Sequence, residues 1–287
     1  MNKLQVLSAF LLLGLSFANA QELPNKQEAS LRAPANMKID GRATEWNNQF
    51  RAYNHATEIF YTVANDDENF YLTVHATDPF IIQKIITHSL VFTVNSSLKK
   101  DDKQQVSLTF PILQEKDTRG ITASLNYRPK NASNDPAVIR KRNDSLVTVM
   151  NSDITYLASL IKVKGIPSTN DYLFNKDLGV QAVELFDADK AYTLEIAIPI
   201  KYLQLPKDQP AKFSYNVKIN GVDKSLLTVE VLETAPDGTK TVLTTNVNPA
   251  SDRYNSKVKL HIAPKDQGYL TTVYPTDFWG EYTLAQK

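Results

Sequence analysis

Cysteine is absent from the 287-residue chain, and glycine is scarce at nine residues. Without cysteine the chain has no disulfide framework, no thiolate metal site and no cysteine nucleophile. The length allows one large domain or two small ones, and 42% hydrophobic residues suffice for a packed core. Stability must therefore come from packing rather than from covalent cross-links.

An excess of charge of either sign is also missing, since 32 basic residues stand against 31 acidic ones. A net charge near zero argues against electrostatic capture of nucleic acid or of an anionic membrane. The one basic run, Arg140-Lys141-Arg142, is flanked by Asp135 and Asp144 and is expected to lie in a solvated loop. We expect no nucleic-acid partner and make no prediction of the oligomeric state.

Long hydrophobic runs are lacking except near the N-terminus. Lys3 precedes an apolar stretch from Val6 to Phe17, and the small residues that end at Ala20 are typical of a cleavage site. The stretch is shorter than the roughly 20 residues that a membrane span needs. We therefore expect a signal peptide over residues 1–20 and an exported protein, periplasmic or extracellular, that is not an integral membrane protein.

Alternation of apolar and polar residues dominates the chain beyond a polar, flexible arm at 21–35. In the clearest segment, 213–220, every second residue is apolar, which predicts a strand with one buried face. Further strands are expected at 58–64, 70–77, 90–95, 105–111, 145–150, 156–163, 180–186, 192–198, 226–233 and 239–246. The pattern predicts an all-β fold, either a β-sandwich or a barrel.

Turn signals and gaps between the strands complete this picture. Asp237-Gly238 and Asn220-Gly221 predict tight hairpin turns. No helical period exceeds about two turns, and residues 201–205 predict a single helical turn. The polar stretch 115–144 is interrupted by two prolines, and we interpret it as a long central insertion loop rather than a linker between domains.

Catalytic signatures are absent: the chain has no G-x-S-x-G, H-E-x-x-H, phosphate-loop or G-x-G-x-x-G sequence. His75 is expected to be a partly exposed strand residue. Glu184 and Glu195 fall on expected neighbouring strands, so they are the candidate acid pair for glycoside hydrolysis, although outward-facing surface residues have the same pattern. We assign no catalytic residue.

A short acidic cluster offers candidate ligands for a metal ion. Asp66, Asp67 and Asp78 supply oxygen atoms of the kind that calcium takes. Residues 65–69 equally have the composition of an ordinary hairpin turn, so both interpretations stay open. Calcium is the one cofactor that these residues would suit.

Five motifs occur in a recognisable order between residues 36 and 285. They are Ile39-Asp40-Gly41 followed by Glu45-Trp46, then residues 61–78, 192–199, 213–220 and 278–284. In this order the chain resembles a family 9 carbohydrate-binding module, a β-sandwich of secreted bacterial proteins related to DOMON-type domains. The resemblance implies a single jelly-roll or immunoglobulin-like β-sandwich over residues 36–287. This sandwich would be non-catalytic and would bind a glycan or polysaccharide.

Sugar-binding members of that family stack loop aromatics, typically tryptophans, on a sugar ring. Both tryptophans of this chain, Trp46 and Trp279, fall within the scaffold motifs, so we expect structural roles for them. Trp46 in particular is expected to plug one end of the sandwich with its ring buried and its N–H bonded.

The central region offers the remaining aromatic candidates for a ligand site. We expect Tyr127 and Tyr172 to stack on the sugar, with Asn170 and Asp171 as polar partners. Two alternatives remain: a structural or protein-interaction sandwich that has lost its sugar site, or an activity associated with glycoside hydrolysis.

Overall fold

The structure is a computed structural model that describes residues 22–96, 98, 105–129, 133–167, 171–205, 210–264 and 267–287. The predicted signal peptide with its cleavage after Ala20 lies outside the described residues, and so does Asn170. The described strands assemble into three antiparallel sheets.

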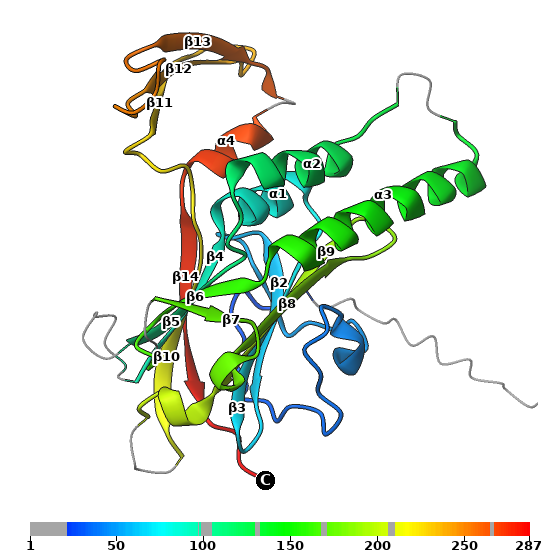
Figure 1. Cartoon of the computed structure of the whole chain (residues 1–287), viewed down its shortest axis with the longest axis vertical. Helices are drawn as coiled ribbons and strands as arrows, with labels where there is room; N and C mark the ends of the chain where they lie inside the picture. The colour runs from blue at the N-terminus through cyan, green and yellow to red at the C-terminus, as the bar shows by residue number, and fades with distance from the viewer. Residues whose placement is uncertain are drawn as a thin grey trace, which may run out of the picture.

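Two of these sheets pack face to face and form a β-sandwich, as predicted (Figure 1). The five-stranded sheet has the order β1-β2-β3-β9-β8, and the six-stranded sheet has the order β14-β10-β4-β5-β6-β7. The bounds of the first sheet are β1 Ala52–Asn54, β2 Ile59–Asn65, β3 Asn69–Ala76, β8 Gln181–Phe186 and β9 Tyr192–Pro199. Those of the second are β4 Leu90–Asn95, β5 Gln105–Phe110, β6 Leu160–Lys164, β7 Tyr172–Phe174, β10 Lys212–Ile219 and β14 Thr276–Thr283.

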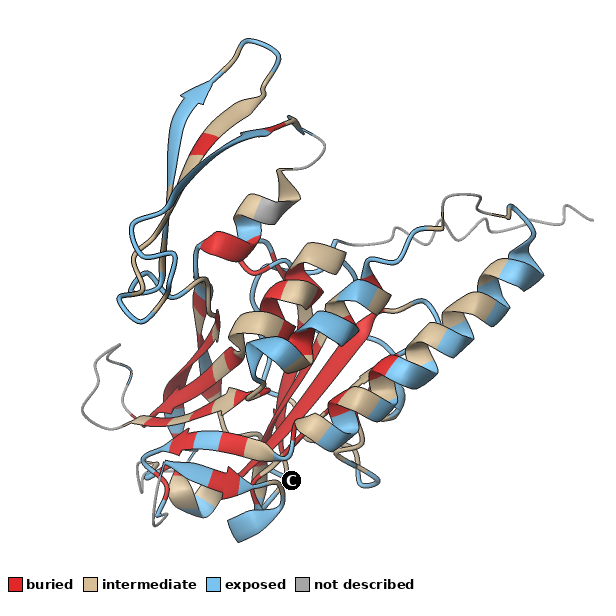
Figure 2. Ribbon diagram, turned by 45° about the horizontal axis from the view of Figure 1, so that its top comes forward, coloured by how far each residue is buried: buried red, intermediate tan, exposed pale blue. Residues whose placement is uncertain are grey.

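The core lies between the two sheets, where the strands bury their inward-facing side chains (Figure 2). In β9 all eight residues are buried, because its outer face is covered as well. Phe70 of β3 contacts Phe213 of β10 edge to face, with ring centroids 5.1 Å apart. Tyr215 lies so close to β14 that a Cβ atom on Gly280 would approach its ring to 2.2 Å, so this position requires glycine. Packing of this density explains how the sandwich holds together without cysteine.

Helices close one end of the sandwich and cover part of its flank (Figure 1). They are α1 Pro79–His88, α2 Glu115–Leu125, α3 Pro136–Leu157 and α4 Gly268–Val273, with short 3-10 turns η1 Ala43–Trp46, η2 Asp177–Gly179 and η3 Ile200–Tyr202. The turn at η3 was predicted, but the longer helices were not. The predicted loop at 115–144 and the predicted strand at 145–150 are wrong, because α2 and α3 occupy those residues, and only the end of the 156–163 segment is a strand.

Two of the missed helices begin with the same dipeptide. Asp78 caps α1 by accepting hydrogen bonds from the amides of Phe80 and Ile81, and Pro79 is the first helical residue. Asp135 and Pro136 start α3 in the same way. Aspartate at the N-cap followed by proline is a helix-start signal. Although α3 has 22 residues, no described helix is both long and apolar enough to cross a membrane.

A third sheet of three strands stands apart from the sandwich, beyond α4 (Figure 1). It consists of β11 Leu227–Thr234, β12 Lys240–Asn246 and β13 Lys257–Ile262. The predicted hairpin at Asp237-Gly238 joins β11 to β12 and is confirmed. The predicted hairpin at Asn220-Gly221 is wrong: this segment leads from β10 into a different sheet, and Gly221 is needed because a Cβ would lie 2.3 Å from the Val273 carbonyl oxygen.

Hydrogen bonds join the N-terminal arm to the sandwich. The Gln27 side chain bonds both the N–H and the C=O of Val63 on β2, at 2.9 and 2.8 Å. The Tyr61 hydroxyl accepts a hydrogen bond from the Gln27 amide, and Tyr282 bonds the backbone of Leu31. The arm therefore covers the part of the β2 edge that the short strand β1 leaves open.

Candidate functional site

The outer face of the five-stranded sheet carries a row of aromatic side chains. The register pairs Tyr53 with Phe60 and Phe60 with His75, and paired residues of neighbouring strands point to the same face. Phe50, just before β1, stacks on His75 with centroids 5.0 Å apart and planes within 13°. All four rings, the aromatic row, are half-buried, so each has an accessible part.

A pocket of about 600 Å³ lies at the His75 end of this row. Phe50, His75 and Thr193 contribute the sheet face, and further lining residues come from three other places. These are Arg42, Thr44 and Asn48 around η1, Val147 and Asn151 of α3, and Asp187 in the turn after β8. The pocket therefore combines aromatic rings with amide, hydroxyl and charged groups.

A buried carboxyl group holds the η1 segment in place beside this pocket. Glu195 Oε2 accepts hydrogen bonds from the backbone amides of Asp40 and Gly41, both at 3.0 Å. Gly41 has a φ of 78°, and a Cβ there would lie 2.9 Å from the backbone carbon of Glu184. Burial raises the pKa of Glu195 to about 8, an effect that the two amide bonds partly offset. The motif Ile39-Asp40-Gly41 is thus hydrogen-bonded directly to the motif at residues 192–199.

Trp46 fastens the same segment from its other end. Its ring is buried, and its Nε1 donates to Thr73 Oγ1 at 3.0 Å, which confirms the predicted burial and the bonded N–H. Its predicted location is wrong, however. Trp46 packs with Ala43 and Ala64 on the outer face of the five-stranded sheet, whereas α1 closes the end of the sandwich.

His75 is positioned by the sheet as an uncharged ring. It is a partly exposed strand residue, as predicted, and its Nδ1 lies 3.0 Å from Thr193 Oγ1. Burial lowers its pKa, and Asp187 opposes this only in part. Burial therefore favours the neutral form of His75, and within the described residues no hydrogen bond engages its Nε2 atom.

Two polar groups at the rim are held at the end of β8 and in the turn that follows it. The Asn151 side chain bonds both the N–H and the C=O of Phe186, which fixes α3 against β8. Asp187 Oδ1 accepts hydrogen bonds from the amides of Asp189 and Ala191, each at 2.9 Å. These bonds occupy one oxygen of Asp187, and its Oδ2 takes no part in them.

The predicted ligand residues lie elsewhere. Tyr127 follows α2, whereas Tyr172 lies on the edge strand β7, where Lys162 Nζ is 5.9 Å from its ring centroid. Both tyrosines and Asp171 are exposed, but none of them lines the pocket. The structure does not bring Tyr127 and Tyr172 together as a stacking pair.

The predicted calcium ligands are likewise separated. Asp66 and Asp78 lie beyond opposite ends of β3, roughly 25 Å apart at the usual rise of a strand. Asp66 accepts hydrogen bonds within its hairpin turn, and Asp78 caps α1. Asp67 pairs with Lys287 and Arg32, which keep its pKa below the ordinary value. Among the described residues no cluster of His, Asp or Glu side chains could hold a metal ion.

The candidate acid pair for glycoside hydrolysis is also not formed. Glu184 of β8 pairs with Leu194 of β9, and both side chains face the core. Glu195 follows Leu194 on β9, so its side chain faces outward. Glu184 Oε2 accepts a hydrogen bond from the Tyr192 hydroxyl, and burial raises the pKa of Glu184 to about 8. The two carboxyl groups lie on opposite faces of the sheet, so they cannot flank one glycosidic bond.

Trp279, for which a structural role was expected, does not lie in the core. Phe278, its neighbour on β14, is buried in the core, so Trp279 faces the outside of the six-stranded sheet, where it is half-buried beside Asn216.

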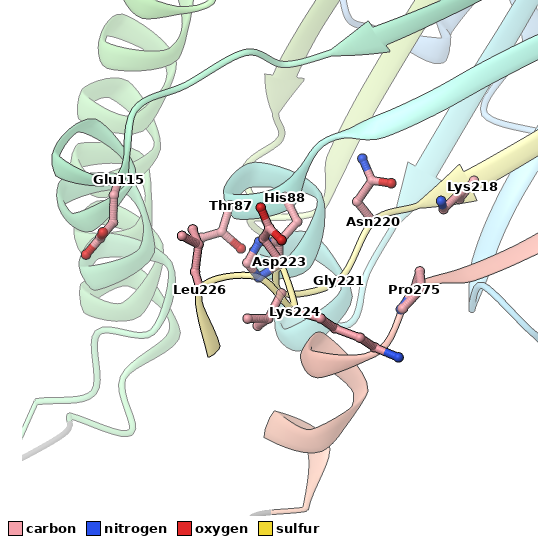
Figure 3. A pocket seen from close by; sticks show the side chains of 11 residues that line it. Thr87, His88, Glu115, Lys218, Asn220, Gly221, Asp223, Lys224, Leu226 and Pro275 are labelled. Carbon is pink, nitrogen blue, oxygen red and sulfur yellow. The ribbon is translucent and has the colours of Figure 1, made fainter. Parts of the chain in front are cut away.

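A second pocket of about 630 Å³ lies where the sandwich meets the third sheet (Figure 3). Its lining is mainly polar and charged and includes Lys218, Asp223 and Lys224. Glu115 and Lys218 lie on opposite sides of it in Figure 3, so its charges do not converge on one point. With His88 as its one ring besides Pro275 among the lining residues, this pocket offers no stacking surface comparable to the aromatic row.

Comparison with models of known protein families and with curated proteins finds no match to this chain. The resemblance to a family 9 carbohydrate-binding module therefore stays a prediction.

Proposed function

We propose that the chain is an exported, non-catalytic β-sandwich that binds carbohydrate at the pocket beside the aromatic row. The observation that carries this proposal is the pairing of Phe50 and His75, two stacked and half-buried rings, with polar side chains around them. Pockets that combine apolar rings with a few oriented polar groups are the usual form of a small-molecule site. An open, aromatic- and amide-lined pocket favours sugar binding over a sandwich that has lost its site.

The chemistry of the lining suits a sugar ring in two ways. An accessible aromatic face attracts the C–H groups of a pyranose, and the uncharged ring of His75 adds no desolvation cost for an ion. Arg42, Asn151 and Asp187 supply donors and acceptors for hydroxyl groups around that face. Tyr53 and Phe60 extend the apolar surface along the sheet, which provides for a second sugar unit of a longer glycan.

Binding without hydrolysis fits the acidic groups at this site. Among the described lining residues Asp187 is the single carboxylate, whereas most glycoside hydrolases use two carboxyl groups on either side of the bond. Glu195 lies nearby, but the amides of Asp40 and Gly41 occupy one of its oxygens and its side chain is fully buried.

A glycan array tests the proposal with the purified chain from Gln21 onward. We expect the wild-type chain to bind at least one class of glycan, and His75→Ala to weaken that binding about tenfold or more. His261→Ala is the matched control, because His261 is exposed on the third sheet. Absence of binding to every glycan, or equal binding by the His75 variant, would overturn the proposal.

A further inference from the structure

The three-stranded sheet has one apolar face that the chain covers only in part. Register places Val231, Val242 and Leu260 in one row and Val229, Thr244 and Val258 in the next. Val242 in the centre is buried, but Val231, Val258 and Leu260 are 42%, 51% and 38% exposed. In Figure 1 this sheet projects from the sandwich, so its outer strands are open on their far sides.

The two edges of this sheet carry opposite charges. β11 bears Glu230 and Glu233, whereas β13 bears Lys257 and Lys259, and all four side chains are exposed. The register aligns Glu230 with Leu243 and Leu243 with Lys259, so the charges lie on one face, opposite the apolar rows. Within the described part of the chain no strand pairs with the outer edge of β11 or of β13.

Open edges of this kind expose backbone donors and acceptors that another strand can pair with. Charged side chains usually protect such edges, and here they disfavour contact between two β11 edges or between two β13 edges. The same charges favour contact between β11 and β13, because each glutamate then faces a lysine across the new junction. The charges therefore disfavour pairing between two like edges, but they do not prevent β11 of one copy from pairing with β13 of another.

We propose that copies of this chain associate head to tail, with β11 of one copy pairing with β13 of the next. The junction extends the sheet and brings the acidic edge of one copy next to the basic edge of the other. It also makes the apolar faces of successive copies continuous. Because the two edges differ, the contact is heterologous and leaves one free edge at each end, so it builds an open row. Its residues do not overlap the pocket, so this inference is independent of the proposed carbohydrate binding.

Charge exchange between the edges tests this pairing by sedimentation velocity over a wide concentration series. One variant carries Glu230→Lys and Glu233→Lys, and the other carries Lys257→Glu and Lys259→Glu. Wild-type chain is expected to form growing oligomers at low salt that dissociate as salt screens the edges. Each variant alone has two like edges, and its association should weaken about tenfold or more.

Mixing the two variants, or combining all four substitutions in one chain, recreates unlike edges and should restore association. Lys116→Glu with Lys141→Glu is the matched control for the Lys257→Glu and Lys259→Glu variant, since both lysines are exposed on helices and the net charge changes by the same amount. A wild-type chain that stays monomeric throughout would overturn the proposal. So would association that survives in both single-edge variants, or that the mixture does not restore.

Discussion

The sandwich and the projecting sheet are built from the same kind of alternating strand but differ in where their apolar faces go. In the sandwich, the apolar side chains of β9 and β10 are almost completely buried between two sheets. In the third sheet, only Val242 and Ile262 are buried. Alternation therefore specifies a strand, but whether its apolar face meets the same chain or another molecule depends on topology.

The edges of the two regions differ in the same way. The N-terminal arm covers the open part of β2, and Gln27 takes both hydrogen bonds that Val63 offers there. Within the described residues no strand pairs with the outer edge of β11 or β13, and on β11 the Tyr274 hydroxyl bonds the Val229 carbonyl at 3.2 Å. The sandwich is thus the more deeply buried region, and the third sheet leaves apolar side chains and both outer strand edges exposed.

Matched leucines give the largest expected contrast. Leu194→Ala removes a fully buried side chain from the sandwich core and should lower the free energy of unfolding by about 2–5 kcal/mol. Leu260→Ala, at a position 38% exposed on β13, should cost about 1 kcal/mol or less. Urea unfolding of the two variants measures this difference. Equal losses would contradict the division between the two regions.

The pH dependence of stability should also belong to the sandwich. Burial raises the pKa of Glu184 and of Glu195 from 4.5 to about 8, so between these values the folded state binds more protons than the unfolded state. The free energy of unfolding should therefore fall as pH rises from 5 to 8, by several kcal/mol.

Neutral substitutions check the origin of this pH dependence. Glu184→Gln keeps an acceptor for the Tyr192 hydroxyl but cannot ionise, so it should flatten the profile. Glu230→Gln, at an exposed position on β11, should leave the profile unchanged. A profile that is flat in the wild-type chain would show that neither buried carboxyl group has a raised pKa.

The hydrogen bonds between Gln27 and the β2 edge should contribute less to stability. Gln27→Ala leaves the N–H and C=O of Val63 without their partners and should lower the free energy of unfolding by about 1–3 kcal/mol. It should also speed hydrogen exchange of the Val63 amide, which mass spectrometry of exchanged peptides can follow. Unchanged exchange in this segment would show that the arm does not protect the edge.

Much of the sandwich follows from the sequence because its strands alternate cleanly, as β9 and β10 do. The helices were missed for identifiable reasons. Asp78 was assigned to a metal site and Pro136 to a loop, although each belongs to an Asp-Pro helix start. In α3 only Met150 and Ile154 are buried, so its sequence lacks a wide apolar stripe.

The aromatic row could not be predicted from one sequence. Its rings come from positions as far apart as Phe50 and His75, and only the register of β1, β2 and β3 places them together. Neither tryptophan belongs to the aromatic row. The expectation that tryptophans mark a sugar site therefore could not point to the outer face of the five-stranded sheet. The choice of Tyr127 and Tyr172 depended on a central loop that is in fact two helices.

The most direct test of the proposed function is isothermal titration of a soluble oligosaccharide against two variants. Phe50→Ala removes the ring that stacks on His75, and Tyr172→Ala removes the exposed ring on β7 that lies outside the pocket. We predict that Phe50→Ala weakens binding about tenfold or more while Tyr172→Ala leaves it unchanged. Loss of binding with Tyr172→Ala and retention with Phe50→Ala would contradict the assignment of the site.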